Sequence, residues 1–208
     1  MGEKYDDCYE YDREPFFRID PSYRPLEAAA VPRDLLDRIR PWTPESQAAL
    51  ASELGRPAQT IQGTAEAGMR ILRDAGSDPA ALASAGRQTV ATATAGYQEV
   101  DRQFRENGAL LRELERDPRL PKDGLKDAAL AGGRKATDSV SQHLSLFQQA
   151  INTTLGTAQD ATLNALHSQA EAAVNRVAER AYANTNNLYR AVFQRGMADV
   201  PDEGPAAV

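Results

Sequence analysis

Proline is distributed unevenly along this chain of 208 residues, which contains twelve prolines in all. None of them lies between residues 80 and 117 or between residues 122 and 200. Because proline removes a backbone hydrogen bond and clashes with the preceding helical turn, it seldom occurs inside a helix. The two proline-free windows can therefore hold long helices, whereas Pro15, Pro21, Pro25 and Pro32 favour an extended N-terminal segment.

Bulky side chains are scarce beyond that segment. Six of the thirteen aromatic residues lie in the first 27 positions, and the remaining chain is rich in Ala, Thr, Gln, Ser and Asn. Such a composition favours thin helical bundles over a thick layered core. We predict an all-α fold: an elongated helical hairpin or bundle with a long C-terminal helix of 11-residue period and an extended N-terminal arm.

Four parts are expected along the chain. Thr43 before Pro44 is a typical helix start, and Gly55 and Gly76 are typical helix ends. They predict a short helical collar. The expected parts are an extended acidic and aromatic docking arm at 1–42, the collar at 43–76, a long helical hairpin at 77–196 with helices at about 78–117 and 137–195, and a disordered tail at 197–208.

Small and apolar residues recur every three or four positions in the first proline-free window. Only Asn107 interrupts a series that comprises Ala83, Gly86, Val90, Ala93, Tyr97, Val100, Phe104, Leu111 and Leu114. A sustained seven-residue repeat of this kind is typical of a coiled-coil seam. We therefore assign Val90, Tyr97, Val100 and Phe104 to a seam through which the protein assembles with itself.

The second window repeats at intervals of 11 residues, an average of about 3.67 residues per turn that predicts a nearly straight or slightly right-handed seam. The series comprises Leu144, Leu155, Leu166, Val177 and Leu188. A companion series begins at Val140 and Ile151 and becomes less hydrophobic toward Asn184. We assign the whole first series and Ile151 to the self-assembly seam, on a helix about 85 to 90 Å long.

Charged side chains are unusually rare in parts of both windows. Between Ser139 and Ala170 the only one is Asp160, and between residues 80 and 98 the only one is Arg87. A solvated helix normally carries Glu and Lys on its outer face, so a neutral polar face indicates a surface covered by other subunits. The alternative is a compositional drift toward Ala and Thr that has no structural meaning.

The net charge of −6 and a pI near 5.1 argue against nucleic acid as the main partner. The first twelve residues are too acidic for a secretory signal, and no run of about 18 apolar residues could span a bilayer. We expect a soluble protein made in the cytoplasm, without a transmembrane span. A single cysteine, Cys8, excludes an internal disulfide and a metal site built from cysteines.

Motifs for catalysis or metal binding are missing from the sequence. His143 and His167 are the only histidines, and on one helix they would point about 120° apart, so they cannot share a metal. The segment 131–137 contains glycine, lysine and threonine without the spacing of a phosphate-binding loop. The stripe from Asp160 to Glu171 is interpreted as an outward polar face. We therefore expect no enzymatic activity and no cofactor or metal.

The N-terminal arm combines aromatic and acidic residues, with eight acids against four bases in residues 1–27. Segments that lack a packed core usually lack aromatic residues, so these side chains predict docking onto a partner protein. Alternatively, Phe16, Phe17 and Ile19 fold back onto the chain's own bundle. The predicted docking residues are Tyr5, Tyr9, Tyr11, Phe16, Phe17 and Tyr23.

Together these features predict a structural protein that forms homo-oligomers through helical seams and binds other structural proteins through its arm. In general character, without a motif match, the bundle region looks like helical components of tailed-phage virions, such as internal or ejection core proteins and neck or tail adaptors. That likeness implies repeated copies incorporated into a virion. The alternatives are a phasin-like protein that coats a granule or surface, and a helical component of a secretion system.

Overall fold

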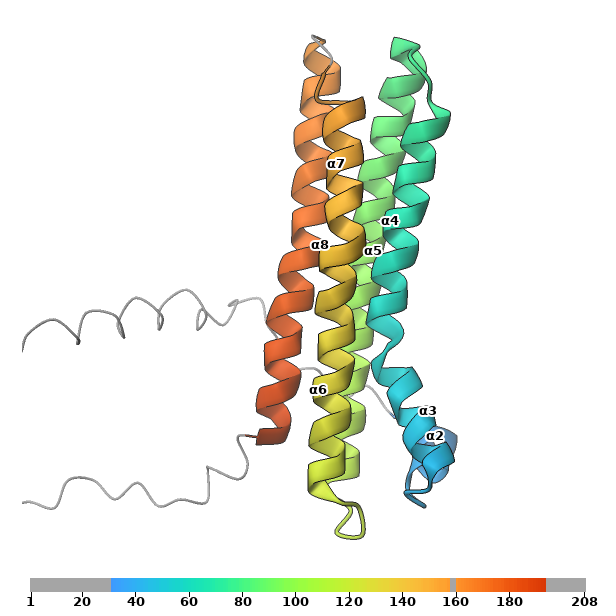
Figure 1. Cartoon of the computed structure of the whole chain (residues 1–208), viewed down its shortest axis with the longest axis vertical. Helices are drawn as coiled ribbons and strands as arrows, with labels where there is room; N and C mark the ends of the chain where they lie inside the picture. Colours follow the sequence, from blue (N-terminus) through green and yellow to red (C-terminus); the bar gives the residue numbers. More distant parts are fainter. Residues whose placement is uncertain (1–30, 158–159, 194–208) are drawn as a thin grey trace, which may run out of the picture.

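The computed structural model describes the backbone of residues 31–157 and 160–193 and the side chains of the same ranges up to residue 185. This part of the chain is all-helical, which confirms the predicted fold class, and it forms an elongated bundle (Figure 1). Its elements are α2 (Arg33–Ile39), α3 (Pro44–Leu54), α4 (Arg56–Asp74), α5 (Pro79–Glu115), α6 (Lys122–Ser139), the π-helical turn η1 (Val140–Leu144), α7 (Ser145–Thr154) and α8 (Ala161–Phe193).

Four helical segments form the bundle, and each runs in the opposite direction to the one before it in the chain: α4, α5, the continuous segment from α6 through η1 to α7, and α8. The neighbours α5 and α8 are therefore parallel, as are α4 and the segment α6–α7. Neighbouring pairs are α4 with α5, α5 with α8, α8 with α6 and α7, and these in turn with α4. At about 1.5 Å per residue, α5 is about 55 Å long. The short helices α2 and α3 cover one end of the bundle, beside the start of α4 (Figure 1).

Side-chain caps explain where the helices start. Thr43 accepts a hydrogen bond from the backbone N–H of Ser46 at the start of α3, and Asp78 accepts one from Ala81 at the start of α5. The Asp160 carboxylate accepts from the first-turn N–H groups of α8. Each cap satisfies donors that the first helical turn leaves unpaired. Gly76, with φ of +65°, provides the left-handed residue that the turn from α4 to α5 requires.

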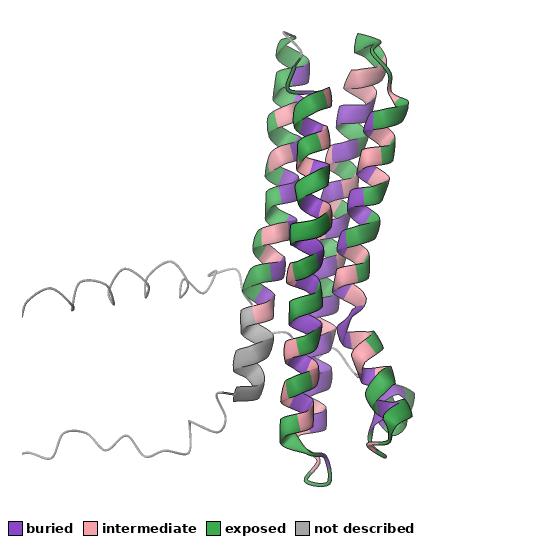
Figure 2. Ribbon diagram, in the orientation of Figure 1, coloured by how far each residue is buried: buried purple, intermediate pink, exposed green. Residues whose placement is uncertain are grey.

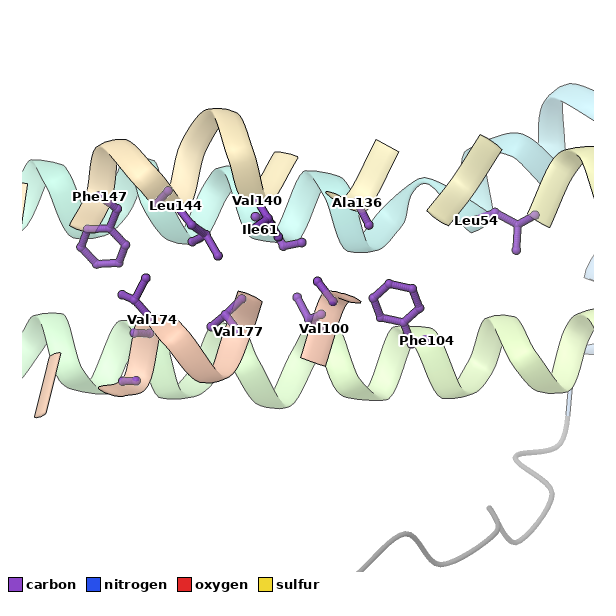
Figure 3. Packing of buried hydrophobic residues seen from close by; sticks show 14 of the residues in the cluster. Leu54, Ile61, Val100, Phe104, Ala136, Val140, Leu144, Phe147, Val174 and Val177 are labelled. Atoms are coloured by element: carbon purple, nitrogen blue, oxygen red, sulfur yellow. The ribbon is translucent and has the colours of Figure 1, made fainter. Parts of the chain in front are cut away.

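One continuous hydrophobic core fills the interior (Figures 2 and 3). Figure 3 shows Ile61, Leu144 and Phe147 on one side facing Val100 and Val174 on the other, and all five are at most 2% exposed. Alanine and glycine fill the narrower places, which allows the helices to approach closely. The predicted thin bundle with few aromatic residues is therefore closed by small side chains around a few large ones.

The π-helical turn has a cause in the hydrophobic spacing. The buried positions of this segment are four, four, three, four and four residues apart, an average of about 3.8 against 3.6 in an α-helix. A π turn accommodates one additional residue and so returns the buried side chains to the same face. The positions are Ala136, Val140, Leu144, Phe147, Ile151 and Leu155.

Part of the segment predicted as an extended arm, 1–42, is helical, because α2 occupies Arg33–Ile39. Pro32 and Pro41 bracket this helix, and its Leu35, Leu36 and Ile39 belong to the hydrophobic core. Because prolines are frequent in this region, the sequence favours an extended segment there, although the three- and four-residue spacing of Leu35, Leu36 and Ile39 is that of a helix. Residues 1–30 and the tail predicted at 197–208 lie outside the described residues.

The helix predicted over 137–195 is divided in two, and the connection predicted at 118–136 is mostly helix α6. The chain reverses between Thr154 and Ala161, because Gly156 follows the end of α7 and Asp160 caps α8. Glycines in α6 allow neighbouring helices to pack closely against it. A Cβ on Gly132 would lie 2.8 Å from Leu54 Cβ, so this position admits only glycine at the observed helix separation.

Candidate interaction surface

The residues assigned to the self-assembly seam form the interior of the single chain. Val100, Phe104, Leu144, Ile151, Leu155, Leu166 and Val177 are buried, and Val90 and Tyr97 are partly buried against them. Leu188 lies outside the described side chains. The hydrophobic contacts of the seam are thus made within one bundle, because the chain reverses at residues 155–160 and folds the 11-residue series onto itself. In this structure they are not available to a second subunit.

An uncharged surface does exist on the outside of the bundle. We use this name for the exposed residues of segments 80–98 and 139–170, which form the first part of α5, the whole of α7 and the first part of α8. Because α8 lies between α5 and α7, the surface continues over two adjacent sides of the bundle. Its members include Ala91 and Ala95 on α5, Ser145, Leu146, Gln149 and Thr153 on α7, and Ala161, Ala165 and Ser168 on α8.

Most hydroxyl groups on this surface already have a hydrogen-bond acceptor. Ser145, Thr153 and Ser168 each donate to the carbonyl oxygen four residues earlier in their own helix, at 2.6, 3.0 and 3.1 Å. A hydroxyl whose proton is engaged in this way loses less on leaving water than a free donor does. Covering the surface therefore costs less than its polar composition suggests.

Side-chain hydrogen bonds join α7 and α8 at the surface of the bundle. Gln148 Nε2 donates to Asn175 Oδ1 at 2.8 Å, and His167 Nε2 lies 2.7 Å from Asn152 Oδ1. His167 Nε2 is also 3.8 Å from a Glu171 oxygen. The contact between His167 and Asn152 therefore joins α8 to α7.

Asp160, the single acid of segment 139–170, has a structural role. It was expected on an outward polar stripe that ends at Glu171, but its carboxylate is engaged by the backbone N–H groups of Thr162 and Leu163 at 2.8 and 3.0 Å. Its negative charge lies at the positive end of the α8 dipole, which reduces its influence on the surrounding surface.

The opposite half of the bundle is held by ion pairs. Arg56 lies 3.1 Å from Glu53 and 3.4 Å from Glu106, and Arg102 pairs with Glu99 and Glu106. The hydrogen bond from Arg102 lowers the pKa of the Glu99 carboxyl, and the bond to Glu99 raises the pKa of the Arg102 guanidinium. Most ion pairs of the described residues therefore lie in this half, whereas Glu66, Arg70, Arg73 and Asp74 of α4 carry charge at the other end.

At the far end of this half, Arg119 donates to Asp117 from its guanidinium and from its backbone N–H. These hydrogen bonds hold the pKa of the Asp117 carboxyl well below its usual range, and Arg40 adds a smaller attraction at 3.7 Å.

No protein-family model, curated protein or solved structure matches this chain. Among the residues that the structure describes, no group of three or more His, Cys, Asp or Glu side chains could hold a metal ion. No helix in the same ranges combines the length and the hydrophobicity needed to cross a bilayer.

The six aromatic residues predicted to dock the arm all precede residue 31 and lie outside the described residues. The sequence predicts the charge depletion that defines the uncharged surface, but the same prediction places both halves of the 11-residue series on one continuous helix. The signal that it missed is the pair Gly156 and Asp160, a helix end followed by a helix start.

Proposed function

We propose that this protein is a non-catalytic structural component that associates with further copies of itself through the uncharged surface. The observation that carries the proposal is the contrast between the two halves of the bundle. One half carries most ion pairs of the described residues, whereas the exposed positions of α7, the start of α8 and the start of α5 carry Arg87 and the capping Asp160 as their only charges. In a chain of net charge −6, such a surface can meet its own copy without repulsion.

The dimensions of the surface suit this role. At about 1.5 Å per residue, segments 80–98 and 139–157 are each about 28 Å long, and the uncharged part of α8, residues 161–170, is about 15 Å long. With about 10 Å of width for each helix, the three strips together project about 710 Å². A standard interface takes about 800 Å² from each partner. Contact over the whole uncharged surface therefore approaches the size of a standard interface.

The scarcity of large exposed hydrophobic side chains among the described residues favours self-association over the coating of a granule. Among the described residues, Leu146 and Tyr182 are the exposed large hydrophobics, at 52% and 46%. A helix that lies on a lipid or polymer surface needs a broad apolar face. Leu146, in the middle of the uncharged surface, is instead suited to be a single hydrophobic anchor in a mainly polar interface.

The cellular setting that we propose is a tailed-phage particle, on the general likeness to helical virion components that the sequence suggests. This part of the proposal is tested separately, by probing purified particles for the protein and by identifying the neighbouring genes. Portal, capsid or tail genes beside it would support a virion role, whereas a polymer synthase gene would oppose it.

Self-association is tested with two matched substitutions on α8. Ala165→Glu places an acid in the uncharged surface, and Ala183→Glu places the same acid at an exposed alanine in the charged half. Sedimentation equilibrium of the full chain is expected to show oligomers for the parent and for Ala183→Glu, and a dissociation constant at least about tenfold higher for Ala165→Glu, because a buried unpaired carboxylate costs more than about 1.4 kcal/mol.

A monomeric parent chain at all concentrations would disprove the proposal. Equal weakening by both substitutions would show that net charge, rather than the uncharged surface, controls association.

A further inference from the structure

A cavity of about 340 Å³ lies at the charged end of the bundle, between α2, the junction of α3 with α4, and the second half of α5. Val31, Leu35 and Leu110 contribute apolar walls, and Arg38 and Asn107 contribute polar groups. Its volume is within the range of about 300 to 1,000 Å³ that is usual for ligand pockets.

Asn107 belongs to the cavity wall but offers the cavity no free donor. The residue is only 2% exposed, and its Nδ2 group, which has no hydrogen-bond partner among the described residues, is itself buried. Recognition at the cavity therefore depends on its apolar walls and on the charges at its rim.

Arg38 and Asp34, both exposed residues of α2, supply charge at the rim of the cavity. Both line the cavity from α2, and neither has an ion-pair partner within the described part of the chain. The other arginines of the cavity, Arg56 and Arg102, are already paired with glutamates. The rim thus offers one unpaired positive and one unpaired negative group, beside apolar walls.

We propose that the cavity binds the segment Glu14–Asp20 of the same chain, with Phe16 and Phe17 as its hydrophobic anchors. This segment has the complementary composition. It contains two adjacent phenylalanines for the apolar walls, Arg18 for Asp34, and Glu14 and Asp20 for Arg38.

The described chain begins at the wall of the cavity, which supports this occupant. Val31, the first described residue, is itself part of the cavity wall, so the N-terminal arm departs from the rim. Phe17 precedes Val31 by fourteen residues, which can span up to about 46 Å and need to reverse direction only once. Pro21 and Pro25 lie in this stretch and favour turns. Tethering gives such a segment an effective concentration near the millimolar range.

The inference does not depend on self-association through the uncharged surface, which lies at the other end of the bundle. Its consequence is competition: a partner protein that binds Phe16 and Phe17 must first displace them from the cavity. Access to the arm is then controlled by the bundle.

Photo-crosslinking of the full chain tests the proposal. Phe17 is replaced by the photo-reactive analogue p-benzoylphenylalanine, and crosslinked peptides are identified by mass spectrometry. Crosslinks are expected within one chain, from position 17 to peptides that contain Leu35 or Leu110. The charge reversal Arg38→Glu is expected to remove most of this product, whereas Arg33→Glu, on the same helix but outside the cavity wall, leaves it unchanged.

Circular dichroism of both variants checks that these exposed charge reversals leave the bundle folded. Product of dimer mass would show that the cavity takes the arm of another copy, and intramolecular crosslinks to other parts of the bundle would show that the arm docks elsewhere. Either result, or equal loss of product in Arg33→Glu and Arg38→Glu, would overturn the proposal.

Discussion

Two glycines of α4 should respond in opposite ways to the same substitution. Gly63 and Gly68 both lie inside the helix, where glycine is about 1 kcal/mol less favourable than alanine. A Cβ on Gly63 would have no atom within 4 Å, whereas a Cβ on Gly68 would overlap the ring of Phe147. Gly63→Ala is therefore expected to raise the free energy of unfolding by about 1 kcal/mol.

Gly68→Ala gains the same helical preference but must move a fully buried ring. Phe147 is 0% exposed and cannot move into solvent without losing its burial. Overpacking of a core costs about 1 to 3 kcal/mol, so Gly68→Ala is expected to be about 1 to 3 kcal/mol less stable than Gly63→Ala. Urea unfolding followed by far-ultraviolet circular dichroism measures this difference directly.

A second variant identifies the cause. If Phe147 produces the penalty, Phe147→Leu in the Gly68→Ala background should recover part of it, and the two changes should be non-additive because the residues touch. Equal stabilisation by the two alanines would refute the contact between α4 and α7 on which the core packing depends.

Three further predictions concern charge. Because the pKa of Asp117 is lowered in the folded chain, its contribution to stability is present above the unfolded value of about 3.9 and is lost as pH falls further; Asp117→Asn should reduce this acid-induced loss in unfolding experiments. Self-association through the uncharged surface should change little between low and high salt, as measured by sedimentation equilibrium, since no surface ion pairs contribute to it. Asp160→Ala should lower the free energy of unfolding by about 1 kcal/mol through loss of the α8 cap, without weakening self-association.

Local signals in the sequence were sufficient for the helices that have clear caps. Thr43 with Pro44 and the turn at Gly76 mark α3 and the end of α4 in both the prediction and the structure. These signals involve neighbours in the chain, so no knowledge of tertiary packing is needed to interpret them.

The remaining differences arise from long-range contacts. Glycine is unfavourable inside a helix, but a Cβ on Gly133 would lie 2.6 Å from Thr185 Cγ2, so glycine at this position lets α6 approach α8. The 11-residue series was assigned to contacts between subunits because a sequence period does not reveal whether the opposing helix belongs to the same chain. The charge depletion predicts an unusual surface, but its location on two adjacent sides of the bundle follows only from the order of the helices.

The antiparallel path gives the bundle two unlike ends. The described chain enters at α2 and leaves at the end of α8, both at the same end of the bundle, while the turns from α4 to α5 and from α7 to α8 lie at the other (Figure 1). Copies that pack side by side in the same direction would carry all their arms on one rim, whereas copies packed in opposite directions would carry arms on both. Fluorescent proteins fused to either terminus would report this polarity by energy transfer and would leave the uncharged half unobstructed, whereas an insertion at Gly76 would place foreign mass beside it.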